Sequence, residues 1–284
     1  MYRSAVAFLL LACLAASVHA ACPDDIQVAA FVSDYRDLQV SRGFGPDLTM
    51  QDALCAQSKV VRRLSESLGP VVGYKAGLTN PAVQVRFGVD HPVRGFLLRD
   101  MLVRSGAQLP AKFGARPLWE ADLIVEVEDP AGLLRARTAR EAAESVSFVV
   151  PFMELPDLLL DSKETLNGPA LVAINVGARM GALGAPIPMQ TSDEFIDALA
   201  NMTVVLIEDG RELARGPGSA IMGHPLSSAM WLAHDLERSG VGLKAGDLLS
   251  LGTFLPFQPT KPDTTVTVQY LGLPGDPSVT VSFK

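Results

Sequence analysis

The pattern of apolar and polar residues predicts two helices near the start of the chain. Residues 24–40 place apolar side chains at helical spacing, and residues 48–70 do so more regularly. In the second segment Thr49 is a suitable N-cap, and Gly69 and Pro70 supply a stop signal. The side chains expected on one face of this helix are Leu54, Val61, Leu64 and Leu68.

The rest of the chain alternates mainly with the period of strands. Residues 71–78 predict a strand and residues 80–88 a short helix. Further strands are expected at 118–129, 169–181, 202–210, 247–254, 264–272 and 278–283, with helices at 191–200 and 224–240. No internal repeat or long linker interrupts this order. We therefore expect an α+β protein with a mostly helical region at 21–110 and a β-rich domain at 111–284.

Composition and charge limit the classes of function. The chain has 284 residues, of which 48% are hydrophobic and 19% are charged, as in a compact globular protein. Its net charge is −7 and it has no basic run, so we expect no nucleic-acid partner. An acidic protein also adheres poorly to anionic lipid surfaces.

The first twenty residues have the pattern of a secretory signal peptide. Arg3 precedes an apolar run, and Val18 and Ala20 are spaced as at a cleavage site. The run is too short for a stable membrane span. We expect cleavage near Ala20 and a secreted or periplasmic protein. A lipid anchor at Cys13 is the second interpretation, because the apolar run before that cysteine is short.

Cleavage there leaves two cysteines, Cys22 and Cys55. Paired cysteines in an exported protein usually form a disulfide, which would fix the mature N-terminus to the second helix. The alternative is two unrelated buried thiols.

The segment WEADLIVEVED carries several acids at strand spacing. Glu120, Asp122, Ile124, Glu126 and Glu128 share one face of such a strand. One interpretation is a solvated acidic face opposite a buried one. The other is that Glu120 and Asp122 converge on a hard divalent cation, which prefers oxygen ligands.

A third ligand for such a cation is available in VVPFMELPD. Glu154 stands alone in this apolar run, where an unpaired carboxylate is costly. The competing interpretation is an ion pair with an arginine. Zinc is not expected, because no histidine has the spacing of a zinc ligand to a cysteine or to another histidine.

The segment GYKAGLTNP raises a similar pair of interpretations for a cation. Lys75 lies on the predicted strand just before a turn, between Gly73 and Gly77. It is either an ordinary surface lysine or a charge directed into a pocket.

Taken together and in order, these segments resemble the 2-keto-4-pentenoate hydratases of the fumarylacetoacetate hydrolase superfamily. The likeness begins at GYKAGLTNPAVQVRFGVDHPVRGFL, continues through WEADLIV and PFMELPD, and is strongest in GSAIMGHPLSSAMWLAHDLERSGVGLKAGDLLSLGT. It covers nearly all of the mature chain. The resemblance implies a mixed β-roll core, a Mg²⁺ or Mn²⁺ ion, and a short 2-oxo or 2-hydroxydienoic acid as substrate.

The resemblance also implies roles for residues. By position, Glu120, Asp122 and Glu154 match metal ligands, Lys75 matches a catalytic lysine, and Gly77, Asn167 and Thr253 match positions near the substrate. Asp122 stands where related hydratases often have Glu. The acid expected soon after the HP pair is replaced by Val93, so Asp90 is the nearby candidate for a second catalytic residue.

Three functions remain open at this point. The leading one is a metal-dependent hydro-lyase that acts on a small molecule. Assembly into a homo-oligomer is left open. The second is a decarboxylase of the 4-oxalocrotonate type. The third is a non-catalytic exported binding protein with the same fold, since a fold alone does not establish an activity.

Overall fold

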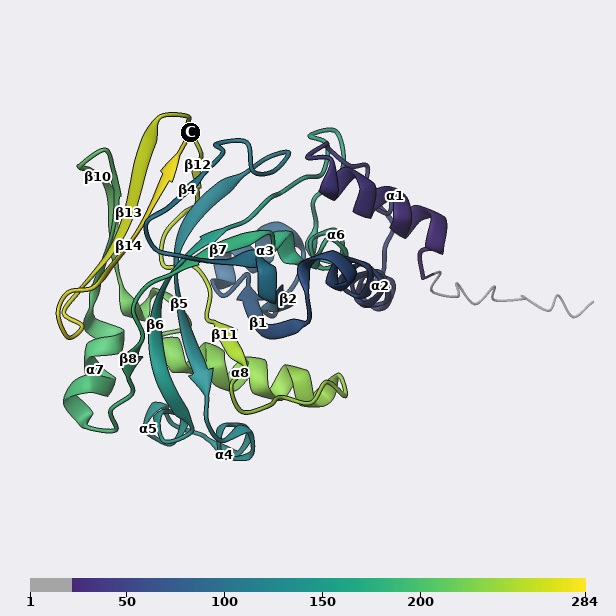
Figure 1. Cartoon of the computed structure of the whole chain (residues 1–284). Coiled ribbons are helices and arrows are strands. Elements are labelled where there is room, and N and C mark those ends of the chain that lie inside the picture. The colour runs from purple at the N-terminus through teal and green to yellow at the C-terminus, as the bar shows by residue number, and fades with distance from the viewer. Residues whose placement is uncertain (1–21) are drawn as a thin grey trace, which may run out of the picture.

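The fold is built on two β-sheets that pack face to face, with helices around them (Figure 1). The computed structural model describes residues 22–284. The signal segment expected at 1–20 lies outside the described residues. Within residues 22–284 no helix is long and apolar enough to cross a membrane.

The larger sheet has nine strands and collects them from the whole chain. Its main path runs β2-β1-β11-β5-β6-β7-β3, with β12 beside β5 and β8 beside β6. β1 and β11 are parallel, as are β3 and β7, whereas the other pairs are antiparallel. The bounds are β1 Val71–Gly77, β2 Val93–Leu98, β3 Leu102–Arg104, β5 Leu118–Val127, β6 Val146–Leu155, β7 Met180–Leu183, β8 Ile187–Pro188, β11 Leu248–Ser250 and β12 Gln258–Pro259.

The second sheet has five strands in the order β10-β9-β13-β14-β4. Its pairs are antiparallel except β14 with β4. The bounds are β4 Ala107–Leu109, β9 Thr203–Glu208, β10 Arg211–Pro217, β13 Thr264–Leu271 and β14 Ser278–Phe283. The expected α+β class with a mixed β-roll core is confirmed.

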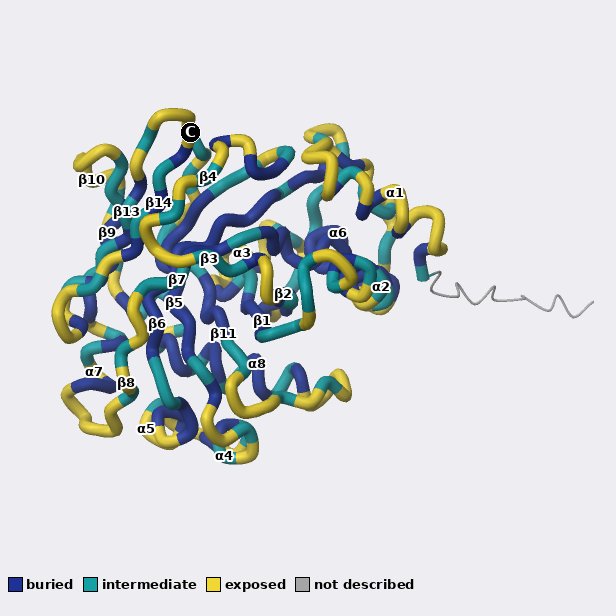
Figure 2. Tube along the Cα trace, viewed as in Figure 1, coloured by how far each residue is buried: buried dark blue, intermediate teal, exposed yellow. Residues whose placement is uncertain are grey.

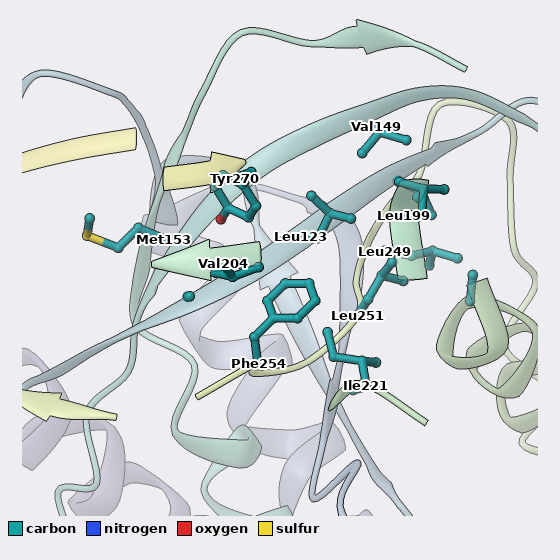
Figure 3. Packing of buried hydrophobic residues seen from close by; sticks show 14 of the residues in the cluster. Leu123, Val149, Met153, Leu199, Val204, Ile221, Leu249, Leu251, Phe254 and Tyr270 are labelled. Atoms are coloured by element: carbon teal, nitrogen blue, oxygen red, sulfur yellow. The ribbon is translucent and has the colours of Figure 1, made fainter. Parts of the chain in front are cut away.

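The main hydrophobic core lies between the two sheets. β5 contributes Trp119, Ala121, Leu123, Val125 and Val127, which alternate along the strand and are all buried. Figure 3 shows Leu123 beside Val204 of β9 and Tyr270 of β13. Because successive side chains of a strand point to opposite faces, the other face of β5 is directed away from this core.

Helices complete the molecule. They are α1 Asp25–Arg36, α2 Met50–Leu68, α3 Pro81–Phe87, α4 Pro130–Arg135, α5 Ala139–Ala143, α6 Gly168–Ala173, α7 Asp193–Asn201 and α8 Pro225–Arg238. Apolar residues of α1, α2 and α6 form a second core. Thr49 caps α2 in a capping box with Asp52, as expected. The assignment of Leu54 to the buried face was wrong, because this side chain is exposed and Ala53, Ala56 and Val60 pack inward instead.

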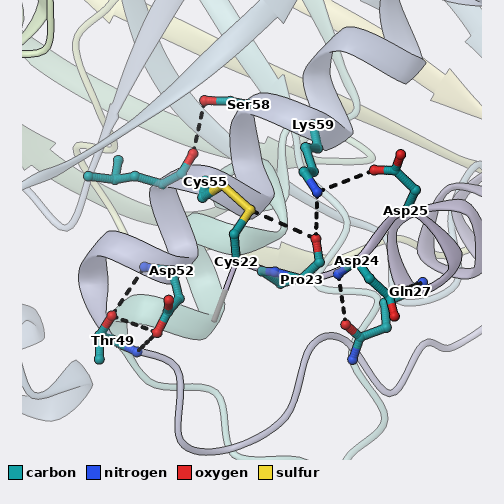
Figure 4. Close-up of a disulfide and its surroundings, with 11 residues drawn as sticks. Cys22, Pro23, Asp24, Asp25, Gln27, Thr49, Asp52, Cys55, Ser58 and Lys59 are labelled. Carbon is teal, nitrogen blue, oxygen red and sulfur yellow. Dashed lines mark hydrogen bonds and ion pairs between the residues drawn. A yellow bond between two sulfur atoms is a disulfide. The ribbon is translucent and has the colours of Figure 1, made fainter. Parts of the chain in front are cut away.

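A disulfide joins Cys22 to Cys55, with 5.6 Å between the two Cα atoms (Figure 4). It ties the segment before α1 to the second turn of α2. Next to it Lys59 donates a hydrogen bond to the Pro23 carbonyl and pairs with Asp25. The interpretation of two separate thiols is excluded.

Two expectations about organisation need correction. Residues 169–181 were expected to be one strand, but they form α6, a left-handed turn and β7. The boundary expected near residue 110 does not divide the sheet, because β1, β2 and β3 join strands from beyond it. Figure 2 shows β5 and β6 buried along most of their length, at the centre of the shared sheet.

Candidate active site

One cavity brings together side chains from strands far apart in the sequence. It has a volume of about 130 Å³, and its charged lining consists of Lys75, Glu120 and Glu154. Gly77 and Thr253 also line the cavity. Both residues were expected to lie near the substrate. The other walls are mostly apolar, and include Phe87, Leu118, Leu158, Leu171 and Val176.

β1 carries Lys75 into this cavity. The strand lies between β2 and β11, where Lys75 pairs with Gly95 on one side and Ser250 on the other. The side chain is only 4% exposed. Its Nζ forms an ion pair with Glu154 and donates a hydrogen bond of 3.0 Å to the Val176 carbonyl. Lys75 is therefore a buried site residue, and not an ordinary surface lysine.

β5 and β6 bring two acids side by side. Glu120 and Glu154 are direct partners in the antiparallel register, so their side chains project on the same face of the sheet. Both are buried, which excludes the solvated acidic face considered for Glu120. Burial, together with the negative charge of Glu154, raises the pKa of Glu120 well above its ordinary value. Glu154 forms its ion pair with Lys75. The alternative to a metal site had been an ion pair with an arginine.

Asp122 lies on the same face of β5, but its carboxylate forms hydrogen bonds with residues 250–252. Oδ1 accepts hydrogen bonds from the backbone N–H groups of Leu251 (3.1 Å) and Gly252 (2.9 Å), and Oδ2 accepts one from the Ser250 hydroxyl. Asp122 does not line the cavity. Burial and the charge of Glu154 raise its pKa to about 7, against the opposing effect of Ser250. Asp122 therefore anchors the segment that leads to Thr253.

A strained turn forms the wall behind Lys75. Asn175, Val176 and Gly177 have consecutive φ angles of 56°, 54° and 66°. This left-handed conformation is unfavourable for a β-branched residue such as Val176. The Asn175 side chain holds the turn in place, because it accepts a hydrogen bond from the Phe96 N–H (2.8 Å) and donates one to the Phe96 carbonyl (2.9 Å).

Glycines on β1 and β2 make room for this turn. A Cβ on Gly77 would lie 2.6 Å from Val176 Cγ1, and one on Gly95 would lie 2.9 Å from the Asn175 carbonyl oxygen. Because Gly77 has no side chain, the turn can pack closely against β1. Gly77 also lines the cavity. The sequence pattern did not reveal the role of Asn175, because the signal is a tertiary contact with β2.

The donor set fits a hard divalent cation. The buried cluster has three carboxylates, Glu120, Asp122 and Glu154, and one ammonium, so the fully ionised cluster has an excess of two negative charges. Within residues 22–284 no group of three or more His, Cys, Asp or Glu side chains is placed so that together they could hold a metal ion. Two carboxylates nevertheless line the cavity, and Mg²⁺ is commonly held by one or two carboxylates together with water and substrate oxygens.

Comparison with known proteins places the chain in a family. No family model matches the chain. A 2-keto-4-pentenoate hydratase of Dechloromonas aromatica is 32% identical over 212 residues, which are 72% of this chain and 75% of the relative. A 2-keto-4-pentenoate hydratase of Paraburkholderia xenovorans is 30% identical over 224 residues, 76% of this chain and 78% of the relative. The chain belongs to the 2-keto-4-pentenoate hydratase family.

A solved structure has the same fold as this chain. The 4-oxalocrotonate decarboxylase of Pseudomonas putida, complexed with magnesium and adipate, is similar with a TM-score of 0.76 and 26% identity. The similarity covers 92% of this chain and 99% of the decarboxylase chain. This chain therefore has the fold of that decarboxylase over nearly all of its length.

Two residues matched to the hydratase family lie outside the cavity. The Asp90 side chain is 97% exposed and lies 3.9 Å from His91, so its place does not suit a catalytic role in this cavity. Asn167 is the N-cap of α6 and accepts a hydrogen bond from the Ala170 N–H. It does not line the cavity, and its hydrogen bond gives it a structural role. Thr253 lines the cavity, and its hydroxyl donates a hydrogen bond to the Leu255 carbonyl at 2.6 Å.

Proposed function

We propose that this protein is a divalent-metal-dependent hydro-lyase that adds water to a short 2-hydroxydienoic acid. The observation that carries the proposal is the meeting of Lys75, Glu120 and Glu154 in one buried cavity, in a chain of the hydratase family. Glu120 and Glu154 are the residues that would hold Mg²⁺ or Mn²⁺. The excess negative charge of the cluster supports this assignment.

A bound cation would supply Lewis-acid polarisation of the substrate's C1 carboxylate and C2 oxygen. Lys75 adds a positive charge on the same wall of the cavity, where it stabilises negative charge that develops on the substrate oxygens. Its ammonium is also a proton donor within the cavity. Glu154 and the Val176 carbonyl hold the ammonium in place, so little reorientation is needed during the reaction.

The substrate chemistry fits this arrangement. Transfer of a proton to C5 of 2-hydroxypenta-2,4-dienoate, with loss of the proton of its C2 hydroxyl, gives 2-oxopent-3-enoate, an α,β-unsaturated ketone whose C4 is electrophilic. Addition of water at C4 then gives 4-hydroxy-2-oxopentanoate. The apolar walls of the cavity limit bulk water, which strengthens the electrostatic effect of Lys75.

The direct test supplies 2-hydroxypenta-2,4-dienoate and Mg²⁺ to the purified protein. We expect the dienoate absorbance to fall, 4-hydroxy-2-oxopentanoate to form, and EDTA to stop the reaction. Binding of Mg²⁺ and a 2-oxo acid without turnover of any dienoate would overturn the hydratase proposal and favour the binding-protein alternative.

A decarboxylase is the second candidate, because the 4-oxalocrotonate decarboxylase structure covers nearly the whole chain. The two activities are separated by supplying 4-oxalocrotonate in a parallel reaction. Release of CO₂ from that compound, without consumption of the pentadienoate, would favour the decarboxylase.

We further propose that the protein is exported and loses residues 1–20. The Cys22–Cys55 disulfide supports this proposal, because such bonds persist mainly in oxidising compartments. Mass spectrometry of the native protein from a periplasmic fraction should give a chain that begins at Ala21. A full-length chain recovered from the cytoplasm would contradict it.

A further inference from the structure

The cavity continues into a larger outer groove. The groove has a volume of about 770 Å³, against about 130 Å³ for the inner cavity. The two share walls made by Asn80, Val83, Phe87, Leu118, Thr253 and Phe257. A five-carbon acid held at Glu120 and Glu154 would leave most of this space unused, so the groove suits a longer substrate.

The shared walls are mostly apolar, and some of these apolar side chains are partly exposed. Val83 of α3 and Phe257 of the segment between β11 and β12 are 38% and 50% exposed. Large apolar side chains that gather at the mouth of a pocket indicate a binding surface rather than scattered exposure. A hydrocarbon segment of a substrate could pass between Val83 and Phe257. Binding would be favoured because the segment and these two side chains would all lose contact with water.

Two arginines give the outer part of the groove a positive charge. Arg86 lies near the end of α3 and Arg116 lies just before β5, and both line the groove. No Asp or Glu among residues 22–284 lines it, although the whole chain carries a net charge of −7. The positive charge is therefore local to the groove.

Neither arginine is neutralised by a neighbour. Within the described part of the chain neither forms an ion pair, whereas Arg94 and Arg179 pair with Asp235 and Asp157. Arg116 donates one hydrogen bond, to the Leu160 carbonyl, at 2.8 Å. A guanidinium presents five N–H donors in a fork that matches a carboxylate, so both arginines retain donors for an anion.

We propose that this groove is a subsite for the distal end of the substrate, in which Arg86 and Arg116 bind a terminal carboxylate. The preferred substrate is then a dicarboxylic 2-hydroxydienoic or 2-oxoenoic acid longer than five carbons. The inference rests on the proposed function for the reacting end of the molecule. It adds the two arginines as the residues that determine specificity at the other end.

The kinetic test compares 2-hydroxyhepta-2,4-diene-1,7-dioate with 2-hydroxypenta-2,4-dienoate. The native protein should have the higher kcat/KM on the dioate. The double variant Arg86→Gln/Arg116→Gln should lower the ratio of the two kcat/KM values about tenfold or more, as expected for charge-assisted hydrogen bonds. The control Arg104→Gln changes an exposed arginine of β3 that has no ion pair within residues 22–284, and should leave the ratio unchanged.

A binding test needs no turnover. Adipate and hexanoate both have six carbons and differ only in the distal carboxylate. Calorimetry with Mg²⁺ present should show tighter binding of adipate to the native protein, and this preference should disappear in the double variant but persist in Arg104→Gln.

The results separate this inference from the proposed function. Hydration of the pentadienoate with no preference for the dioate or adipate would overturn the subsite and leave the hydratase standing. Arginine-dependent preference for adipate without hydration of either dienoate would support the subsite and overturn the hydratase. Equal effects of the double variant and of Arg104→Gln would also overturn the subsite.

Discussion

Asp122 and Glu154 differ in their surroundings although both acids lie near the same cavity. Glu154 lines the cavity and pairs with Lys75, whereas the oxygens of Asp122 accept hydrogen bonds from Ser250, Leu251 and Gly252. Asp is one methylene shorter than Glu, so its carboxylate stays close to its own strand. This difference in contacts predicts different consequences when each acid is replaced.

Glu154→Gln should weaken Mg²⁺ binding at least tenfold and abolish turnover, because it removes one of the two carboxylates that line the cavity. Asp122→Asn should keep most of the Mg²⁺ affinity. It should lower the free energy of unfolding by roughly 1–3 kcal/mol, because an acceptor for buried donors is altered. Calorimetric titration with Mg²⁺ and urea unfolding measure the two effects. Equal losses of Mg²⁺ affinity in both variants would make Asp122 a ligand.

Asn175 is a positioning residue, because it acts on Lys75 through the Val176 carbonyl. In Asn175→Ala both hydrogen bonds to Phe96 are lost and the left-handed turn can relax. We expect kcat to fall roughly tenfold, about 1.4 kcal/mol in activation free energy, with a smaller change in KM.

Two comparisons test this interpretation of Asn175. Asn175→Asp retains an acceptor for the Phe96 N–H and should recover part of kcat, whereas Lys75→Met should set the lower limit. A fall in thermal stability with unchanged kcat would reduce Asn175 to a structural residue.

The charged residues were predictable from sequence for a physical reason. Glu154 is a single acid in an apolar run, so its need for a partner could be inferred, whereas the strand spacing of Glu120 and Asp122 left a solvated face and a converging pair both open. The environment of each carboxylate could not be inferred, since Asp122 accepts hydrogen bonds from residues 250–252 at the end of β11, and Glu154 pairs with Lys75 of β1. Asp90 was assigned through proximity in sequence to a motif, and its exposed position shows how little such proximity constrains a side chain.

At the scale of elements, α8 depends on a titratable cap. The His224 side chain accepts a hydrogen bond from the Leu226 N–H at Nδ1, so its proton is on Nε2, which donates to the Ile196 carbonyl of α7. Burial lowers the pKa of His224 from 6.5, against the opposing effects of the Ile196 hydrogen bond and the charge of Asp197. Protonation of the ring would remove the acceptor that caps α8.

Acid should destabilise the folded protein through His224. The unfolded chain binds the proton more readily than the folded one, so the contribution of neutral His224 is complete above pH 6.5 and is lost as the pH falls through the lower folded pKa. His224→Asn keeps a cap that does not titrate in this range. Between pH 7 and 5 the native protein should lose roughly 1 kcal/mol of unfolding free energy relative to His224→Asn. Parallel pH profiles from urea unfolding would contradict this.

Elements with regular amphipathic patterns were predicted well, and the exception is instructive. Residues 169–181 form an apolar run that periodicity alone cannot assign to a strand or a helix. Asn167 as N-cap and Pro169 in the first turn are local helix-start signals, and they prevailed in α6. The left-handed turn at 175–177 depends instead on Phe96 and on the space beside Gly77 and Gly95, which no local pattern encodes.

At the scale of the whole molecule, the site is assembled from strands that are far apart in the sequence. β1 pairs in parallel with β11, which places Lys75 beside Ser250, and β11 in turn pairs with β5. A boundary near residue 110 was expected from the order of the predicted elements, because mostly helical segments precede it and mostly strands follow it. Pairing between distant strands overrode this separation, and such long-range pairing is the part of the fold that a single sequence specifies least visibly.

The Cys22–Cys55 disulfide also acts on the whole molecule, since it closes a loop across 33 residues that contains α1. A cross-link of this span should stabilise the folded protein by roughly 3–4 kcal/mol, chiefly through the unfolded chain. The Cys22→Ser/Cys55→Ser variant should therefore have a lower midpoint of urea unfolding. Its kcat at 25 °C should be unchanged, because neither cysteine lines the cavity. Dithiothreitol should lower the midpoint of the native protein to that of the variant and leave the variant unaffected; equal midpoints without reductant would show that the cross-link does not stabilise the fold.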